Sequence, residues 1–276
     1  MQACEVGLKQ DPRQWFAKLS STLVSFGFTQ SKADYSLFTK QVQDKFTAIL
    51  IYVDDMVIAG NDTQEILKLK QQLSSQFHMK DLGESRYFLG LEIVRTVQGL
   101  FVCQKKYVQD LIHDFDLMHS TPVKLPLDTQ LKLDANTGII LSEPDKYRRL
   151  VGKLLYLTLT WPNVSYPVQL LSQFLQNPTT EHMKAALHVV RYLKGSPGQG
   201  ILMANSSAAQ LTAFCDFDWA SCPDTRRSTT GYCILLGNSP VSWKTKKQSV
   251  VSRSSAEAEY RSMVVNVVRL HGCSVC

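Results

Sequence analysis

The sequence lacks the long apolar run that a membrane span requires. None of its apolar stretches approaches the ~20 residues needed to cross the core of a bilayer, and residues 1–10 do not have the shape of a signal peptide. It also lacks a disulfide framework, because its seven cysteines are scattered, odd in number and without regular spacing. We therefore expect an intracellular protein, cytoplasmic or nuclear, and not a secreted one.

The composition is that of an ordinary globular protein. With 276 residues, the chain is long enough for one large domain or two ordinary ones, each with its own core. A net charge of +6 suits a polyanionic partner without requiring one. Cys273 and Cys276 form a CxxC without a second pair, which we interpret as a chance occurrence and not as a zinc site.

The stretch ILIYVDDMVIAG, at residues 49–60, contains a pair of adjacent acids between two aliphatic runs. Two short aliphatic runs flank the adjacent acids Asp54 and Asp55, which predicts two strands with the acid pair at the turn between them. Neighbouring carboxylates repel each other unless a cation lies between them, and Mg²⁺ prefers hard oxygen ligands. The pattern is therefore that of a metal site or of an acidic surface turn, and the stretch alone leaves both open.

Further helices and strands follow from spacing and turn residues. Asp62 and Glu65 have capping-box spacing before an apolar stripe, which predicts a helix over 63–77. Residues 81–104 alternate and break at Gln98-Gly99, which predicts a hairpin. A helix is also expected in the first forty residues, on the stripe Trp15, Phe16, Leu19, Leu23 and Val24. Four more are expected at about 105–115, 147–155, 164–175 and 181–194, and an extended linker is expected at 121–128.

The composition changes at about residue 205, where three expected strands precede a helix, as at the start of the ribonuclease H fold. Asp216 and Asp218 lie in or just after the first of these strands, and Glu257 and Glu259 open the helix. Ser254 and Glu257 have capping-box spacing, so Glu257 already has a local role.

Glu259 has no such role at the helix start, and its position in the helix suggests another one. It lies beside the apolar face expected to pack inward, which is formed by Tyr260, Met263, Val264 and Val267. We favour Asp216 and Glu259 as metal ligands, with Asp218 and Glu257 as supporting groups. The alternative is that all four are solvated surface acids.

Eight motifs in order now carry a resemblance: GLKQDPRQWF, YVDDM, MKDLGESRYFLGLEI, YRRLVGKLLYLT, RYLKG, AFCDFDWASCPDTRRSTTGYC, SWKTKKQ and VSRSSAEAEYR. Together they resemble the Pol polyprotein of copia-type LTR retrotransposons, from mid reverse transcriptase into ribonuclease H. The resemblance covers about residues 7–265. It implies an α+β chain: a partial polymerase palm at 1–128, a helical thumb and connection at 129–205, and an incomplete ribonuclease H-like α/β module at 206–276.

The resemblance also implies a chemistry, two-metal phosphoryl transfer with Mg²⁺ or Mn²⁺. Asp54 and Asp55 would serve the polymerase site, and Asp216 and Glu259 the ribonuclease H site. The implied partners are an RNA template, a DNA primer, an RNA–DNA hybrid, dNTP and the rest of the Pol polyprotein. Exposed basic residues would contact phosphates, or else belong to solvated loops; Trp219 and Trp243 are expected in the core. The basic residues are Arg226, Arg227, Lys244, Lys246 and Lys247.

Several positions depart from the family pattern. The other catalytic aspartate of the palm belongs upstream of GLKQ, and no aspartate follows Asp224. Trp161 and Asn163 stand where the family usually has Arg and Asp. We therefore expect impaired catalysis, with two alternatives: a working enzyme that receives its missing acids in trans, or a module that holds RNA–DNA hybrid without cutting it.

Overall fold

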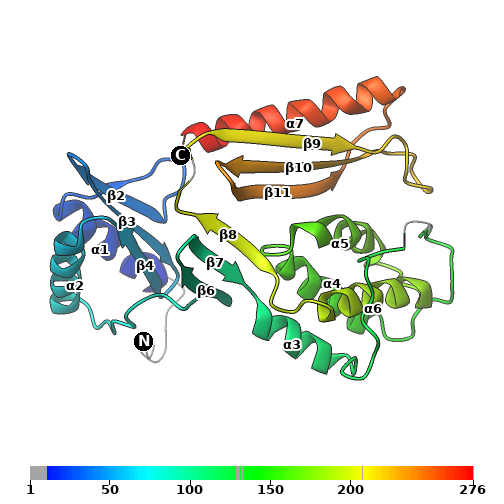
Figure 1. Ribbon diagram of the computed structural model, residues 1–276, viewed down its shortest axis with the longest axis horizontal. Helices are drawn as coiled ribbons and strands as arrows, with labels where there is room; N and C mark the ends of the chain where they lie inside the picture. The colour runs from blue at the N-terminus through cyan, green and yellow to red at the C-terminus, as the bar shows by residue number, and fades with distance from the viewer. Residues whose placement is uncertain (1–10, 129–130, 132, 207, 276) are drawn as a thin grey trace. The chain divides into compact units, whose positions relative to one another are not determined.

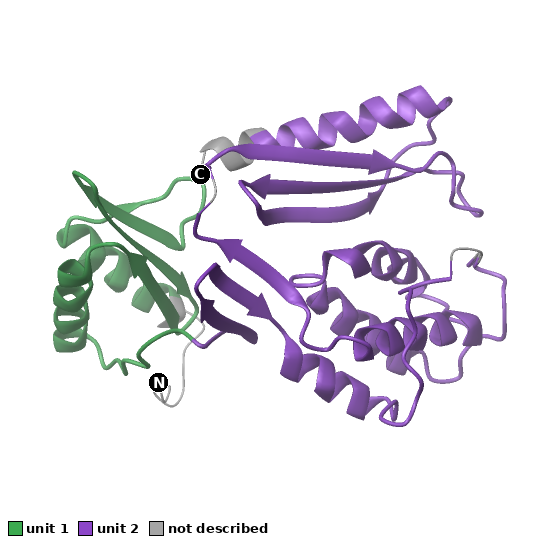
Figure 2. Ribbon diagram, viewed as in Figure 1, with its two compact units in different colours: residues 1–85, 275–276 green, residues 86–274 purple. Residues whose placement is uncertain are grey.

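The structure is a computed structural model that describes residues 11–128, 131, 133–206 and 208–275 (Figure 1). Its contacts divide the chain into two compact units, residues 1–85 with 275–276 and residues 86–274 (Figure 2). Both units combine helices with antiparallel strands, which confirms an α+β chain. In the part of the chain that is described, no helix combines the length and apolar character that crossing a membrane demands.

The first unit is a four-stranded antiparallel sheet with two helices. The strands lie in chain order across the sheet. The helix expected over 63–77 is confirmed, and its N-cap Asp62 accepts a hydrogen bond from the Glu65 amide at 3.2 Å. The elements are α1 (Asp11–Ser25), β1 (Thr29–Gln30), β2 (Leu37–Val42), β3 (Lys45–Tyr52), β4 (Asp55–Gly60) and α2 (Thr63–Gln76).

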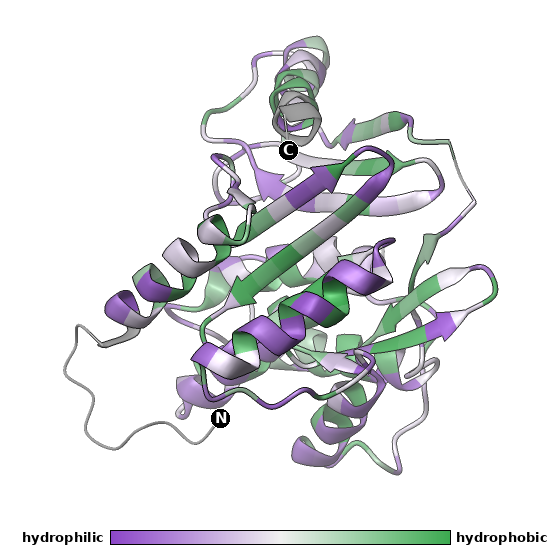
Figure 3. Ribbon diagram, turned by 90° about the vertical axis from the view of Figure 1, so that its left-hand side faces the viewer, coloured by the Kyte–Doolittle hydropathy of each residue, from purple (hydrophilic) through white to green (hydrophobic). Residues whose placement is uncertain are grey.

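One face of this sheet packs on the two helices. Ile49 and Ile51 of β3 are buried there, since alternate residues of a strand point to the same face. Leu19 of α1 and Leu69 of α2 meet them in one core, whereas Val24, expected on the helical stripe, is 54% exposed. Figure 3 shows apolar green and polar purple residues alternating along the helices.

The second unit holds two sheets and a group of helices. The predicted hairpin broken at Gln98-Gly99 is confirmed as β6–β7, and the helix expected over 105–115 is α3. Its elements up to residue 204 are β5 (Tyr87–Phe88), β6 (Leu91–Thr96), β7 (Gly99–Cys103), α3 (Lys105–Asp114), α4 (Pro144–Leu157), η1 (Pro162–Val164), α5 (Ser165–Leu171), η2 (Ser172–Phe174), α6 (Thr180–Lys194) and β8 (Gly200–Ala204).

The strand β8 was not predicted, and it pairs with β7 from about a hundred residues earlier in the chain. The first sheet of this unit therefore has the order β5-β6-β7-β8, all antiparallel. Between β7 and β8 the helices α3 to α6 form the largest core, around Tyr147, Leu154 and Trp161.

The predicted linker at 121–128 is irregular, as expected, but its backbone is fastened to α6. Arg191 donates to the Thr121 carbonyl oxygen at 2.8 Å, and Lys194 donates to three carbonyl oxygens of residues 117–120. Side chains of α6 therefore hold this segment through its main chain.

An exposed glycine in α4 allows a stabilising substitution. Gly152 lies in the middle of the helix, and a Cβ added there would meet no atom within 4 Å. Because glycine loses more backbone entropy than alanine in a helix, Gly152→Ala should raise the free energy of unfolding by about 0.5–1 kcal/mol. Urea denaturation followed by circular dichroism measures this change, and a loss of stability would contradict it.

The last elements are a three-stranded antiparallel sheet and one long helix, as predicted. The sheet has the order β11-β10-β9. The elements are β9 (Leu211–Phe217), β10 (Thr229–Leu236), β11 (Ser239–Lys247) and α7 (Ser255–Val275).

The face of α7 that packs is not the predicted one. Tyr260 is 70% exposed and Val264 62%, and Met263 and Val267 are exposed as well. The buried stripe is instead Ala258, Ser262 and Asn266, which recur every four residues. Small side chains allow the helix to approach the strand closely, and the Ser262 hydroxyl donates to the Asp216 carbonyl oxygen at 3.1 Å.

Candidate metal and nucleic-acid sites

The acid pair lies at the turn of the β3–β4 hairpin, as the sequence predicts. Tyr52 pairs with Asp55, so Val53 and Asp54 form a two-residue turn, and Asp55 is the first residue of β4. Both aspartates are exposed. The turn therefore presents two adjacent carboxylates to solvent.

Strand alternation fixes the face on which Asp55 lies. Ile51 pairs with Met56, and both belong to the core beneath the sheet. Asp55 and its partner Tyr52 are one residue removed from that pair, so their side chains lie on the opposite face. The Asp55 carboxylate is therefore turned away from α1 and α2 and is open to a ligand.

The backbone of this turn is strained at Val53. This residue has φ 54° and is 72% exposed, although the left-handed region is unfavourable for a β-branched side chain. Two-residue hairpin turns with a positive φ at their first residue favour glycine. Strain of this kind is frequent at ligand-binding sites.

Val53→Gly should therefore stabilise the first unit. Relief of about 1–2 kcal/mol of backbone strain exceeds the extra entropy that glycine loses, so we expect a net gain of about 0.5–1 kcal/mol in the free energy of unfolding. Chemical denaturation of the variant beside the parent chain measures it. An unchanged or lower midpoint would show that Val53 is not strained.

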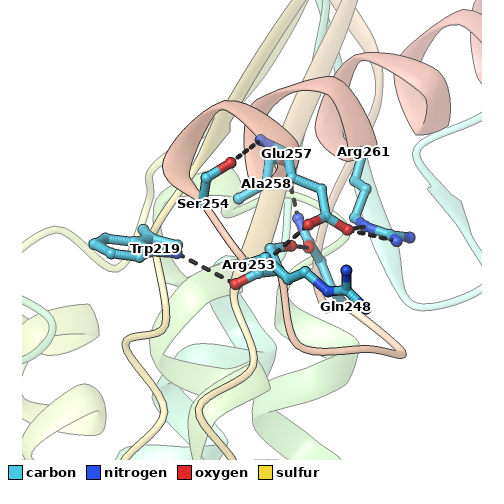
Figure 4. Close-up of polar contacts among 8 residues, drawn as sticks. Trp219, Gln248, Arg253, Ser254, Glu257, Ala258 and Arg261 are labelled. Carbon is cyan, nitrogen blue, oxygen red and sulfur yellow. Dashed lines mark hydrogen bonds and ion pairs between the residues drawn. The ribbon is translucent and has the colours of Figure 1, made fainter.

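The capping role predicted for Glu257 is confirmed at the start of α7 (Figure 4). The Ser254 hydroxyl accepts from the Glu257 amide at 3.2 Å, and the Glu257 carboxylate accepts from the Arg253 amide at 2.8 Å. The Arg253 amide and the Arg261 guanidinium hold the pKa of Glu257 below its usual value. This carboxylate is therefore engaged within its own helix.

Asp216 lies on the sheet face that carries Trp243, and Asp218 follows the end of β9. Asp216 pairs with Gly231, and Gly231 pairs with Thr245 of β11. Thr245 is two residues from Trp243, so Thr245, Trp243 and Asp216 share one face. Asp218 Oδ1 accepts from the Thr229 amide at 2.7 Å.

The helix α7 contacts the other face of this sheet. Gln248 donates both to the Thr230 hydroxyl, at 3.0 Å, and to the Ala258 carbonyl oxygen, at 3.1 Å. Thr230 lies next to Gly231 on β10, so its side chain lies on the face opposite that of Asp216. Over the ranges that the structure covers, no group of three or more histidine, cysteine, aspartate or glutamate side chains could hold a metal ion.

The basic cluster on β11 divides between the two faces. Lys244 and Lys246 are exposed, whereas Lys247 points the other way and donates to Gln173 Oε1 and Cys222 Sγ, both at 2.8 Å. Burial raises the pKa of the Cys222 thiol. Hydrogen bonds from Lys247 and Thr225 lower it by more, so the net pKa lies below the usual value.

The two arginines that the sequence singles out, Arg226 and Arg227, lie in the loop that joins β9 to β10. Both are exposed, and Arg226 has φ 54°. Four of the five predicted phosphate-contacting residues are therefore exposed to solvent, and Lys247 is the exception.

The two tryptophans of this region differ from each other. Trp243 is half-buried and donates from Nε1 to the Thr158 carbonyl oxygen at 2.7 Å. Trp219, predicted in the core, is 55% exposed, so that prediction is wrong. It follows the end of β9, where the chain leaves the sheet. The CxxC cysteines Cys273 and Cys276 fall outside the described side chains.

Trp161 and Asn163 lie among the helices of the second unit. Trp161 is fully buried, and its Nε1 atom has no hydrogen-bond partner. Asn163 donates to the Tyr192 hydroxyl at 2.5 Å.

Comparison with known proteins identifies the family of this chain. The family model for reverse transcriptase (RNA-dependent DNA polymerase) matches residues 2–129. The Pol polyproteins of transposons RE1 and RE2 of Arabidopsis thaliana are each 42% identical over 93% of this chain, which spans 18% of their length.

A shorter relative matches the chain over most of its own length. An uncharacterized mitochondrial protein of Arabidopsis thaliana is 40% identical over 80% of this chain and 92% of its own length. No solved structure matches the chain significantly. By these similarities, the chain belongs to the reverse transcriptases of copia-type retrotransposon Pol polyproteins.

Proposed function

We propose that the chain is a fragment of an RNA-directed DNA polymerase in which Asp54 and Asp55 hold a divalent cation against the phosphates of a nucleotide. The observation that carries the proposal is the β3–β4 turn, where two adjacent aspartates are exposed and the Asp55 side chain lies on the open face of the sheet. Carboxylates placed so close together are stabilised when a cation neutralises them.

The donor set suits Mg²⁺ or Mn²⁺. Mg²⁺ is bound by one or two carboxylates together with substrate phosphates, and the turn offers two. A pair of such ions, when bound, steadies both the attacking and the leaving oxygen in phosphoryl transfer. Asp54 and Asp55 supply the negative charge from neighbouring positions in the chain.

We assign the segments of the chain their proposed roles by analogy with the family. Residues 1–128 would be the partial palm, 129–205 the thumb and connection, and 206–276 a ribonuclease H-like part. The proposed palm spans the first compact unit and the beginning of the second. The partners would be RNA template, DNA primer, RNA–DNA hybrid and dNTP, with phosphates contacted by the exposed basic residues of the last part.

We propose that hydrolysis in the ribonuclease H-like part is impaired. Asp216 and Glu259 are its predicted metal ligands, but Asp216 lies on the sheet face opposite the one that α7 contacts, and Glu259 is exposed on α7. Two crowded cations need three or four carboxylates, and the described residues bring no such set together. Glu257 is held by Arg253 and Arg261. The polymerase site, with two acids, should be impaired as well.

Primer extension tests the catalytic part of the proposal. The purified chain is given a labelled DNA primer on an RNA template, dNTP and either Mg²⁺ or Mn²⁺. The variant is Asp54→Asn, and its control is Asp44→Asn, an exposed aspartate at the β2–β3 turn of the same sheet. Extension that is weak, lost in Asp54→Asn and kept in Asp44→Asn is the expected result. Extension that survives Asp54→Asn would overturn the proposed role.

A second function is a module that holds RNA–DNA hybrid without cutting it. The net charge of +6 and the exposed lysines of β11 favour it. Retention of a labelled hybrid at low salt, without nucleotide incorporation or cleavage, would support this function over catalysis.

A further inference from the structure

The exposed Trp219 is held in a fixed place although its ring faces solvent. Its Nε1 atom donates to the Ser252 carbonyl oxygen at 3.4 Å, which ties the indole to the segment leading into α7. Figure 4 shows Trp219 beside the first turn of that helix. A large aromatic ring that is 55% exposed and tethered at one edge keeps an open side for a ligand.

The backbone beneath the ring is also constrained. Ala220, the next residue, has φ 52°, a conformation that is uncommon for a residue with a side chain. Ala220 is nearly buried, and its amide donates to the Ser228 hydroxyl at 3.0 Å. The chain therefore accepts an unfavourable conformation at the point where it turns Trp219 outward.

Exposed basic residues lie in the two segments on either side of this tryptophan, although Asp218 directly precedes it. Residues 244–254, which include its partner Ser252, carry four basic residues and no acid. The loop on its other side carries Arg226 and Arg227, both exposed, against Asp224. Two nearby acids are already engaged: Asp218 accepts from the Thr229 amide at 2.7 Å, and Glu257 is paired with Arg261 at 2.8 Å.

An exposed aromatic ring among basic residues is the arrangement that binds single-stranded nucleic acid. From the tethered ring, the turned-out backbone and the basic segments beside it, we propose that Trp219 stacks on an unpaired nucleobase. The inference rests on the proposed function, because it adds a base contact to the phosphate contacts proposed there. It makes Trp219 a binding residue for single-stranded ends and not a catalytic residue.

Fluorescence anisotropy of the full chain tests it with two labelled probes, an oligothymidylate of about 12 nucleotides and a blunt-ended RNA–DNA hybrid of the same length. Trp219→Leu keeps an apolar side chain but removes the ring, and Trp219→Phe keeps a smaller one. Tyr260→Leu is the matched control, since Tyr260 is another exposed aromatic, on the open face of α7.

We expect Trp219→Leu to weaken oligothymidylate binding by about 5- to 100-fold, as loss of one stacked base implies. Trp219→Phe should lose less, Tyr260→Leu should match the parent chain, and all should bind the blunt hybrid within about twofold of one another. Equal affinity of Trp219→Leu and the parent chain for oligothymidylate would overturn the inference.

Two further outcomes separate this inference from the function on which it rests. A parent chain that binds the hybrid but not oligothymidylate overturns the role of Trp219 and leaves the proposed function standing. A parent chain that binds neither probe contradicts the nucleic-acid partners themselves, and the inference falls with them. A change of oligomeric state in Trp219→Leu, at unchanged affinity, would assign the ring to a protein contact instead.

Discussion

Trp161→Ala is expected to lower the free energy of unfolding by about 3–5 kcal/mol, the cost of removing a buried tryptophan side chain. Trp161 is fully buried in the largest core and meets Tyr192 edge to face, with ring centroids 6.1 Å apart. Removing the indole would leave a cavity among α4, α5 and α6 that this packing cannot close.

Trp161→Phe separates the packing of the ring from its unpartnered N–H group. Leaving a buried donor without a partner costs about 1–3 kcal/mol, so its removal offsets much of the packing lost with the smaller ring. We expect Trp161→Phe to lie within about 1 kcal/mol of the parent chain. Denaturant unfolding of both variants measures this, with the half-exposed Leu159→Ala as the control that should change little. Equal losses in the alanine and phenylalanine variants would contradict it.

His182→Ala should be nearly as damaging, at about 3 kcal/mol, because a buried ring and two hydrogen bonds are lost together. The His182 ring is fully buried and stacks on Phe174, with centroids 3.9 Å apart. Its Nδ1 accepts from the Thr179 amide at 3.0 Å, and its Nε2 lies 3.1 Å from the Asp134 carbonyl oxygen. An amide can only donate and a carbonyl can only accept, so the ring is neutral with its proton on Nε2.

The same histidine should make stability depend on pH. Burial lowers the pKa of His182 below its usual 6.5, although the Asp134 carbonyl and the charges of Asp134, Asp224 and Glu181 oppose this. The unfolded chain therefore binds a proton first, and stability is complete above pH 6.5 and lost as pH falls below it, at up to about 1.4 kcal/mol per pH unit. As pH falls below 7, the unfolding free energy of the parent chain should approach that of His182→Gln, which lacks the titrating ring. Parallel curves would contradict the neutral buried ring.

Local patterns were enough to predict most elements. The cap at Asp62 and the stripe behind it located α2, the adjacent aspartates located the β3–β4 turn, and Ser254 with Glu257 located the start of α7. Each of these depends on neighbours a few residues apart, where side chain and backbone interact directly.

What required the structure was long-range packing. The strand β8 is five residues of ordinary sequence, and only its pairing with β7 makes it a strand. The apolar residues of α7 indicated the wrong buried face, because close contact with β9 selects Ser262 and Ala258 over Tyr260. Trp219 was misjudged for the same reason, since hydrophobic character does not reveal that the chain turns outward at Ala220.

If Asp54 and Asp55 together bind a divalent cation, a titration with Mn²⁺ will show it without requiring catalysis. Titration of Mn²⁺ followed by electron paramagnetic resonance should reveal a site in the parent chain and in Asp44→Asn. Asp54→Asn and Asp55→Asn should each weaken that site by about tenfold or more, as the loss of one charged ligand implies. Unchanged Mn²⁺ affinity in both variants would contradict it.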